Sequence, residues 1–171
     1  MSRQERTPGY VFDNAGEETS TRFSALEALF DAGTFRHIEA LGISPGWRCL
    51  EVGGGSGSVA TWLGRRVGVD GKVVVTDIDP RFLRDLGQPR IEARKHDIVN
   101  DEIEESYYDI AHTRLVLVHL PGRKRAVQRM IRSCVREGCC CWRNSTLFRW
   151  SRTRKLTPRS IFSRPWARSG R

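Results

Sequence analysis

The sequence predicts an α/β domain with a mostly parallel sheet and helices on both faces of that sheet. Strand-like apolar segments alternate along the chain with amphipathic helical segments, an order that produces parallel strands joined by crossover helices. Glycines gather at residues 53–57, directly after the first of these strands, and Asp77 ends the next one. Open α/β sheets bind ligands at the carboxyl ends of their strands, so both features indicate a ligand site at one edge of the sheet.

The first part of the chain, residues 1–45, is expected to form an arm and helices that cap the core. Residues 1–20 are polar and show no apolar pattern. Apolar side chains then recur at helical spacing over residues 23–30 and 35–41, which predicts two helices. Gly33 lies between the two patterns and is expected to separate them, since glycine is a poor helix former.

The second part, residues 46–137, carries the alternation that defines the fold class. Its strongest strand is rich in β-branched residues, as fully buried parallel strands are. The expected elements are a strand over 47–52, a helix over 59–67, a strand over 72–78, a short helix from Pro80 to Leu86, weaker strands over 91–96 and 107–112, and a helix over 121–136.

Charge divides the chain at the end of this core. The net charge is +9, yet residues 1–137 balance 20 basic residues with 20 acidic ones. Residues 138–171 contain nine basic residues and no acid, so they carry the whole excess. Arginines interleaved with tryptophans can meet phosphates and stack on bases, which keeps nucleic-acid binding by this tail as an alternative function. We do not expect a nucleic-acid partner, because no DNA-binding or RNA-binding motif accompanies the charge.

Other classes are excluded by composition and spacing. No apolar run is long enough to cross a membrane, and the polar N-terminus has no secretory leader, so we expect a cytoplasmic protein without membrane contact. The consecutive residues Cys139, Cys140 and Cys141 lack the separation with which two thiolates hold one zinc ion. We therefore expect no metal site.

The glycine cluster predicts a nucleotide-containing cofactor. Gly53, Gly55 and Gly57 lie between a strand and a helix, where glycine lets the backbone approach a ligand and the helix start offers free N–H groups. A carboxylate at Asp77 can accept hydrogen bonds from two ribose hydroxyls. Two cofactor classes use this arrangement, and Glu51, two residues before Gly53, favours one with a cationic amino group, such as S-adenosylmethionine.

The other class is the nicotinamide dinucleotides. Residues 55–60 fit the spacing G-x-G-x-x-A, so an NAD(P)-binding oxidoreductase stays as an alternative. Against it, some forty residues of helical sequence precede the first strand, whereas dinucleotide folds often start at that strand. A pyrophosphate also favours a loop without an acidic residue beside it.

Five short motifs follow one another along the chain. They are Glu51-x-Gly53-x-Gly55-x-Gly57, Thr76-Asp77-Ile78-Asp79-Pro80, His96-Asp97-Ile98, Tyr108-Asp109-Ile110-Ala111-His112 and Leu115-Val116-Leu117-Val118-His119-Leu120-Pro121. With these motifs, residues 10–137 resemble class I S-adenosylmethionine-dependent methyltransferases. The resemblance implies a Rossmann-like, doubly wound sheet, S-adenosylmethionine as cofactor, and methyl transfer to a small-molecule or other unidentified acceptor.

The resemblance also implies roles for single residues. Asp77 stands where the family binds ribose, with Ile78 beside it. Asp97 stands where the family meets the adenine amino group, and Ile98 would contact the face of the ring. A base is needed only if the acceptor must lose a proton, and His112 at the end of the fourth strand is the candidate because histidine titrates near neutral pH.

The tail departs from the family pattern. After Glu137 the family needs a fifth strand, then a helix and an antiparallel pair of strands. Residues 138–171 show neither alternation nor a helical face. We therefore expect C-terminal strands that are missing or abnormal, and a disordered basic end. With codons chosen for Cys139–Thr146, among them TGC for each cysteine, shifting the reading frame back by one nucleotide gives Leu-Leu-Leu-Glu-Glu-Leu-Asp, a buried strand ending in acids. A frameshift near residue 137 is therefore our interpretation, with a weakly active or inactive product.

Overall fold

A computed structural model describes residues 18–83, 86–143 and 147–151. The predicted N-terminal arm before residue 18 and the basic segment after residue 151 lie outside these residues. Among the described residues, no helix is both long enough and apolar enough to cross a bilayer.

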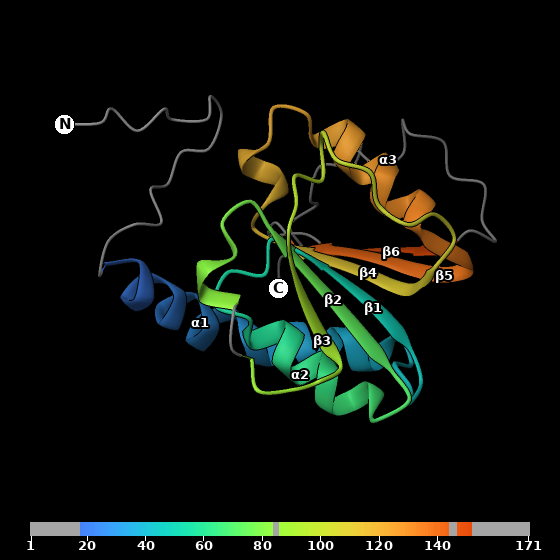
Figure 1. Cartoon of the computed structure of the whole chain (residues 1–171), viewed down its shortest axis with the longest axis horizontal. Coiled ribbons are helices and arrows are strands. Elements are labelled where there is room, and N and C mark those ends of the chain that lie inside the picture. The colour runs from blue at the N-terminus through green and yellow to red at the C-terminus, as the bar shows by residue number, and fades with distance from the viewer. Residues whose placement is uncertain (1–17, 84–85, 144–146, 152–171) are drawn as a thin grey trace, which may run out of the picture.

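A six-stranded sheet forms the centre of the molecule (Figure 1). Its spatial order is β3-β2-β1-β4-β5-β6, with the first five strands parallel and β6 antiparallel to β5. The α/β, Rossmann-like prediction is therefore confirmed. The strands are β1 (Arg48–Val52), β2 (Lys72–Asp77), β3 (Ile91–Lys95), β4 (Tyr108–Arg114), β5 (Cys134–Arg143) and β6 (Leu147–Ser151).

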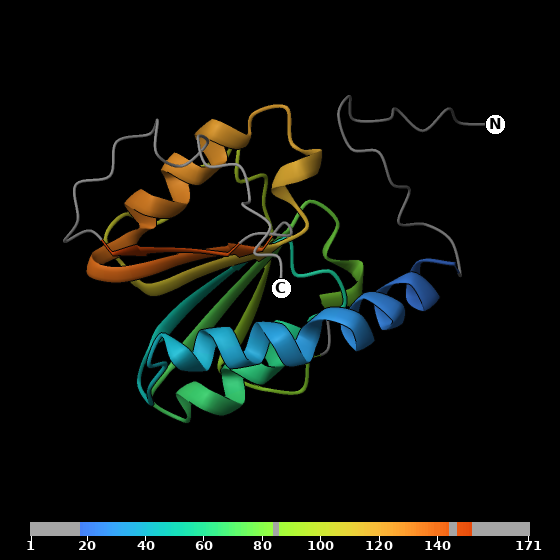
Figure 2. The same cartoon turned by 180° about the vertical axis from the view of Figure 1, so that it is seen from behind.

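Helices cover both faces of the sheet, as Figures 1 and 2 show from opposite sides. The helices α1 (Glu18–Ala40) and α2 (Ser58–Val67) lie on one face, and α3 (Arg123–Ser133) lies on the other. Two short 3-10 helices, η1 (Pro80–Leu83) and η2 (Leu117–His119), follow β2 and β4. Two apolar clusters result, one between the sheet and α1 and α2, the other between the sheet and α3.

The predicted break at Gly33 is wrong, because α1 continues through this residue as one helix. The Thr34 hydroxyl donates to the Phe30 carbonyl at 2.9 Å, so Thr34 bonds to the preceding turn of the same helix. A glycine in a helix interior costs only about 1 kcal/mol. The burial of Ile38 and the stacking of Phe35 on Trp62 offset that cost.

The region around residue 137 also differs from the prediction. Helix α3 ends at Ser133, and β5 begins at once and pairs in parallel with β4 through Arg143, with a shift in register between Tyr108 and Ile110. A fifth strand is therefore present where we expected the C-terminal strands to be missing or abnormal. The hydrogen bonds between neighbouring strands join backbone groups, so a strand can form where the side-chain pattern does not predict one.

The strand order reverses its direction at β1 and β4. The chain moves outward from β1 to β2 and β3, then returns to the opposite side of β1 with β4. The connections after β1 and β4 therefore leave the same edge of the sheet in opposite directions, and this divergence is where doubly wound sheets bind ligands. The glycine loop, residues 53–57, lies at that edge.

Candidate functional site

The glycine loop between β1 and α2 is built on left-handed backbone conformations. Gly53, Gly55 and Gly57 have φ angles of +73°, +57° and +87°, values that cost other residues free energy. The N–H groups of Gly53 and Gly54 donate to the Thr76 carbonyl at 2.7 and 3.0 Å, which ties the loop to β2. The loop is thus fixed before any ligand arrives.

Close neighbours make side chains on this loop difficult to accommodate. A Cβ atom on Gly53 would collide with the branched side chain of Val116 in the segment after β4. A Cβ atom on Gly55 would lie 3.3 Å from the ring of Phe23 in α1. The glycines therefore allow both the segment after β4 and helix α1 to approach the loop.

Asp77 ends β2 directly beside the loop and is only 8% exposed. Its Oδ2 accepts from the Gly55 N–H at 3.2 Å, and its Oδ1 accepts from the Asp79 N–H at 3.0 Å. Burial raises the pKa of this carboxyl above its ordinary value, while the backbone hydrogen bonds from Asp79 and Gly55 oppose the rise. The neighbouring Ile78 is 36% exposed, an apolar surface next to the carboxylate.

The loop after β3 carries the other two predicted cofactor residues. Asp97 is half-buried, and its Oδ1 and Oδ2 accept from the Val99 N–H at 2.8 Å and the Asn100 side-chain amide at 2.7 Å. Ile98 is only 4% exposed and packs into the apolar cluster beneath α3. The structure thus separates the pair: Asp97 lies at the edge of the site and Ile98 lies in the core.

Glu51 and His112 form a buried pair across β1 and β4. Glu51 Oε2 and His112 Nδ1 are 2.5 Å apart, and each side chain is 3% exposed. The two residues occupy the same register position of neighbouring strands. The structure therefore brings together two residues to which the sequence assigned separate roles, a cofactor ligand and a base. Both roles stay predictions.

Comparison with known proteins identifies this arrangement. A sequence model described as "Methyltransferase domain" matches residues 50–141, which contain the glycine loop, Asp77, Asp97 and the fourth strand. The chain belongs to this methyltransferase family. Members of the family use S-adenosylmethionine, so the prediction of that cofactor class is confirmed at the level of the family.

Individual relatives support the same fold. The chain is 22% identical over 130 residues to the ubiquinone/menaquinone biosynthesis C-methyltransferase UbiE of Idiomarina loihiensis, a match that covers 68% of this chain and 51% of that protein. The chain thus spans about half the length of this curated relative. A crystal structure of an S-adenosylmethionine-dependent methyltransferase from Aquifex aeolicus superposes with a TM-score of 0.65 at 19% identity, over 77% of this chain and 72% of that one.

A more distant solved structure shares the core. Phosphoethanolamine N-methyltransferase 1 of Haemonchus contortus, whose crystals hold phosphoethanolamine and S-adenosylhomocysteine, superposes with a TM-score of 0.56 at 19% identity. The match covers 63% of this chain and 24% of that one. At this level of identity the likeness concerns the fold.

The residues present fit a methyltransferase cofactor at two of its parts. The positive-φ glycines keep the loop free of side chains, and Asp77 lies directly beside that loop with Ile78 half-exposed. Glu51 is buried and bonded to His112, and its role as a cofactor ligand stays a prediction.

Helix α1 supplies acidic groups that the sequence did not single out. Glu27 accepts a short hydrogen bond from the Ser56 hydroxyl of the glycine loop. Asp31, one helical turn later, accepts from Ser58 Oγ at 3.3 Å and from Arg114 Nη1 at 2.6 Å. The four-residue spacing of Glu27 and Asp31 was the available signal, since it places both on one helix face. Their partners became visible only in the fold.

A cavity of about 370 Å³ lies beside this contact, between α1, the loop and the start of α2. Hydroxyl groups such as those of Ser24 and Thr61 line part of it. The rings of Phe23 and Phe82 line another part and meet edge to face, with centroids 5.4 Å apart. Helix α1 is therefore incompletely packed where it crosses the loop.

Proposed function

We propose that this protein transfers a methyl group from S-adenosylmethionine to an acceptor. The observation that carries the proposal is the junction of Asp77 with the glycine loop, where a buried carboxylate accepts from the Gly55 N–H beside three glycines of positive φ. A carboxylate at this place suits a ribose, and the start of α2 directly after the loop suits the carboxylate of an amino acid. S-adenosylmethionine contains both groups.

Each residue then has a task. Asp77 accepts hydrogen bonds from ribose hydroxyls, and Ile78 offers its exposed apolar surface to the base. Asp97 keeps acceptor positions beyond its bonds to Val99 and Asn100, and these take the exocyclic amino group of adenine. The sulfonium of the bound cofactor supplies the activated methyl group, so the chain's main work is to align the acceptor and exclude water.

The test of cofactor choice is calorimetric titration of the full chain with S-adenosylhomocysteine and, separately, with NAD. We expect binding of the first and none of the second. Radiolabelled methyl transfer from S-adenosylmethionine to candidate acceptors follows, with small quinols and amines as the first classes, because similar proteins carry C- and N-methyltransferase names. Binding of NAD with no response to S-adenosylhomocysteine would overturn the proposal.

His112 is the proposed base for acceptors that lose a proton. A base lowers the barrier only for such acceptors, so His112→Gln is expected to lower kcat and change its pH profile while leaving the affinity for S-adenosylhomocysteine within about threefold. Glu51→Gln is the matched variant, since it keeps the shape of the buried pair and removes its charge. Unchanged kcat in His112→Gln would limit the pair to a structural role.

We further propose that this chain transfers methyl groups slowly. In support of this, no acidic residue follows Glu137, which is where the frameshift interpretation places the change. The comparison is with a variant that carries Leu-Leu-Leu-Glu-Glu-Leu-Asp from position 139, the residues encoded when the reading frame is shifted back by one nucleotide under the codons chosen above. We expect faster methyl transfer and a higher melting temperature in that variant. Equal rates in the two chains would contradict the frameshift interpretation.

A further inference from the structure

The loop from Asp97 to Glu102, which follows β3, holds its own shape through a network centred on Asp97. The Asp97 carboxylate accepts from Val99 N–H and from the Asn100 side chain, as described above. The Asp97 N–H in turn donates to Asp101 Oδ2 at 2.8 Å, and the Asp97 carbonyl accepts from the N–H groups of Asn100 and Asp101 at 3.0 and 2.8 Å. These bonds fix the loop internally but do not attach it to the rest of the molecule.

His96 attaches one end of this loop to β3. Its Nε2 lies 3.1 Å from the Glu102 carbonyl, and a carbonyl only accepts, so the ring carries its proton on Nε2. The side chain is 9% exposed, and its Nδ1 is buried without a hydrogen-bond partner among the described residues. A buried ring with one nitrogen unsatisfied is costly, which leaves the bond to Glu102 as the visible reason for a histidine here.

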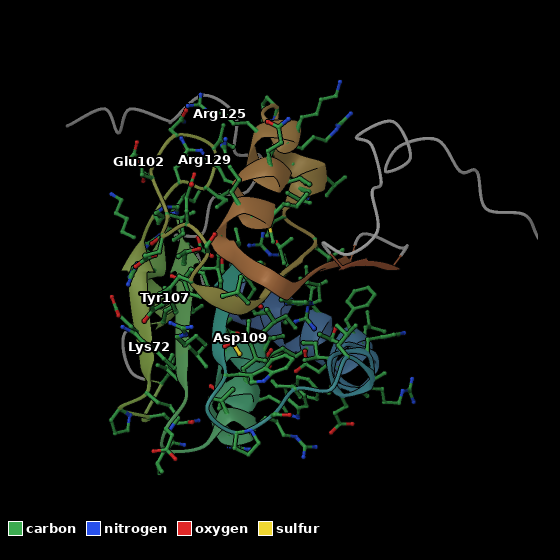
Figure 3. The ribbon with its side chains drawn as sticks, turned by 90° about the vertical axis from the view of Figure 1, so that its right-hand side faces the viewer. Lys72, Glu102, Tyr107, Asp109, Arg125 and Arg129 are labelled. Atoms are coloured by element: carbon green, nitrogen blue, oxygen red, sulfur yellow. The ribbon has the colours of Figure 1, made fainter. Side chains whose placement is uncertain are left out.

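Arg129 attaches the loop from the opposite side. Its guanidinium donates from Nη1 to the Asp101 carbonyl and from Nη2 to the Asn100 carbonyl, the latter at 3.4 Å. Its Nε is buried without a partner among the described residues. Figure 3 shows Arg129 on α3 beside the loop that carries Glu102, with Arg125 nearer the start of the same helix. The planar fork of an arginine presents its N–H groups in a fixed geometry that suits two neighbouring carbonyls.

Helix α3 also contacts the loop at its own start. A Cβ atom on Gly122, the residue before the helix, would lie 2.5 Å from Val99 Cγ1. Other parts of the molecule therefore contact the loop at three places. Gly122 packs on Val99, Arg129 binds the carbonyls of Asn100 and Asp101, and His96 binds the carbonyl of Glu102. All three contacts flank the residue proposed to bind the adenine amino group, and of the residues that make them only His96 belongs to a motif of the cofactor site.

We propose that His96 and Arg129 are positioning residues that hold the Asp97 carboxylate where it accepts from the adenine amino group. The inference rests on the proposed function, since it concerns how that cofactor is recognised. Both residues act through the loop, so removing either one leaves Asp97 in place chemically but lets its carboxylate move. The loss then appears in the recognition of the amino group and not in the binding of the rest of the molecule.

The experiment compares S-adenosylhomocysteine with its inosine analogue, in which a carbonyl oxygen replaces the adenine amino group. In the wild-type chain we expect the amino compound to bind at least about tenfold more tightly, as a hydrogen bond to a carboxylate provides. In His96→Leu and in Arg129→Met we expect that ratio to fall below about threefold. The affinity for the inosine analogue changes little in both variants.

Two matched variants separate positioning from a general loss of structure. His96→Gln keeps an amide N–H that reaches the Glu102 carbonyl, and we expect it to keep the wild-type ratio. Arg125→Met removes the same charge from the same helix at an exposed position, and we expect no change in the ratio. Should His96→Leu fail to fold, Arg129→Met carries the test alone.

The outcomes distinguish the two levels of the argument. If the wild-type chain does not bind S-adenosylhomocysteine, the proposed function fails. If it binds both compounds equally, Asp97 does not read the amino group and the inference is overturned, while the function stands. If the wild type discriminates and both loop variants discriminate equally well, His96 and Arg129 do not position Asp97, and the inference is again overturned.

Discussion

The two loops at the carboxyl edge of the sheet are held in different ways. The glycine loop after β1 is fixed by backbone conformation, with three positive φ angles and N–H bonds to the Thr76 carbonyl of the next strand. The loop from Asp97 to Glu102 contains no glycine and is held by side chains, His96 from its own stem and Arg129 from α3. The first loop is specified largely by its local sequence, and the second depends also on Arg129, which lies far away in the chain.

The same contrast extends to the helices that meet these loops. Helix α1 reaches the glycine loop with acidic groups, and the ion pair of Asp31 with Arg114 ties it to the end of β4. Helix α3 reaches the other loop with an arginine that binds carbonyls. Substitutions in the first loop should therefore cost mainly backbone strain, whereas those in the second should cost hydrogen bonds.

The largest effect is expected for Gly53→Ala. A left-handed φ costs an alanine about 1–2 kcal/mol, and the stiff Val116 side chain has little room to move aside, so we expect a total loss of about 3 kcal/mol in the free energy of unfolding. Urea denaturation measures it. Gly42→Ala is the control, since Gly42 has φ +85° but nothing within 4 Å of a Cβ, and about 1 kcal/mol is expected. Equal costs would remove the role of Val116.

Asp77→Asn tests the ligand face of the glycine loop. Loss of the charged acceptor is expected to weaken S-adenosylhomocysteine binding about thirtyfold, roughly 2 kcal/mol, as measured by calorimetry. In the wild-type chain, affinity should fall as pH is lowered through the pKa of Asp77. Burial raises that pKa above the ordinary 3.8, so the fall begins at a higher pH than for an exposed aspartate.

Stability has the opposite pH dependence at this residue. Because the pKa is higher in the folded protein than in the unfolded chain, the folded protein binds the proton more tightly, and stability from this group is lost as pH rises from 3.8 through the raised pKa. The free energy of unfolding of Asp77→Asn, relative to wild type, should therefore increase over that interval and stay level above it. A difference that does not vary with pH would contradict the burial of the charge.

Arg114→Met tests how α1 is anchored to the glycine loop. The pair with Asp31 is largely buried, with side chains 12% and 20% exposed, so removing the arginine leaves a poorly solvated carboxylate and should cost about 2 kcal/mol. Arg66→Met removes an arginine that pairs with Glu39 on the same helix, where the side chains are 50% and 42% exposed. There we expect less than about 0.5 kcal/mol. Similar losses in both variants would refute the assignment of Asp31 as the anchor.

The smallest effect concerns the internal bond of the second loop. A double-mutant cycle of Asp97→Ala and Asn100→Ala isolates the 2.7 Å hydrogen bond between the two side chains. The bond involves a charged acceptor but lies at a partly exposed site, so we expect a coupling energy of about 1 kcal/mol in urea denaturation. Zero coupling would mean that the loop is held by His96 and Arg129 without help from its own side chains.

The sequence was a good guide where one short segment decides the structure. The β-branched run before Asp77 became β2, and the glycines before Ser58 became the turn into α2, because strand propensity and left-handed backbone are local properties. It misled at Gly33, where packing of α1 outweighed a weak local preference. It also misled after Ser133, where pairing with β4 drew the chain into β5 although the side-chain pattern indicated no strand.

The site residues show the same difference between what local sequence decides and what tertiary packing decides. Residues whose role depends on a strand end, such as Asp77, could be found by spacing alone. The pairing of Glu51 with His112, and of Asp31 with Arg114, joins positions 61 and 83 residues apart in the chain. Nothing in either local sequence selects those partners. The packing of the whole core sets the register between β1 and β4 and the position of α1 on the sheet.

The sequence by itself determined the family, the parallel sheet, the glycine loop and the acid at the end of β2, since each depends on neighbours within a few residues. Only the tertiary structure decided which acids face the loop, that Glu51 is buried against His112, and that His96 and Arg129 grip the loop of Asp97. The reason is physical: side-chain hydrogen bonds act over about 3 Å, and the positions that meet at such distances are chosen by the fold.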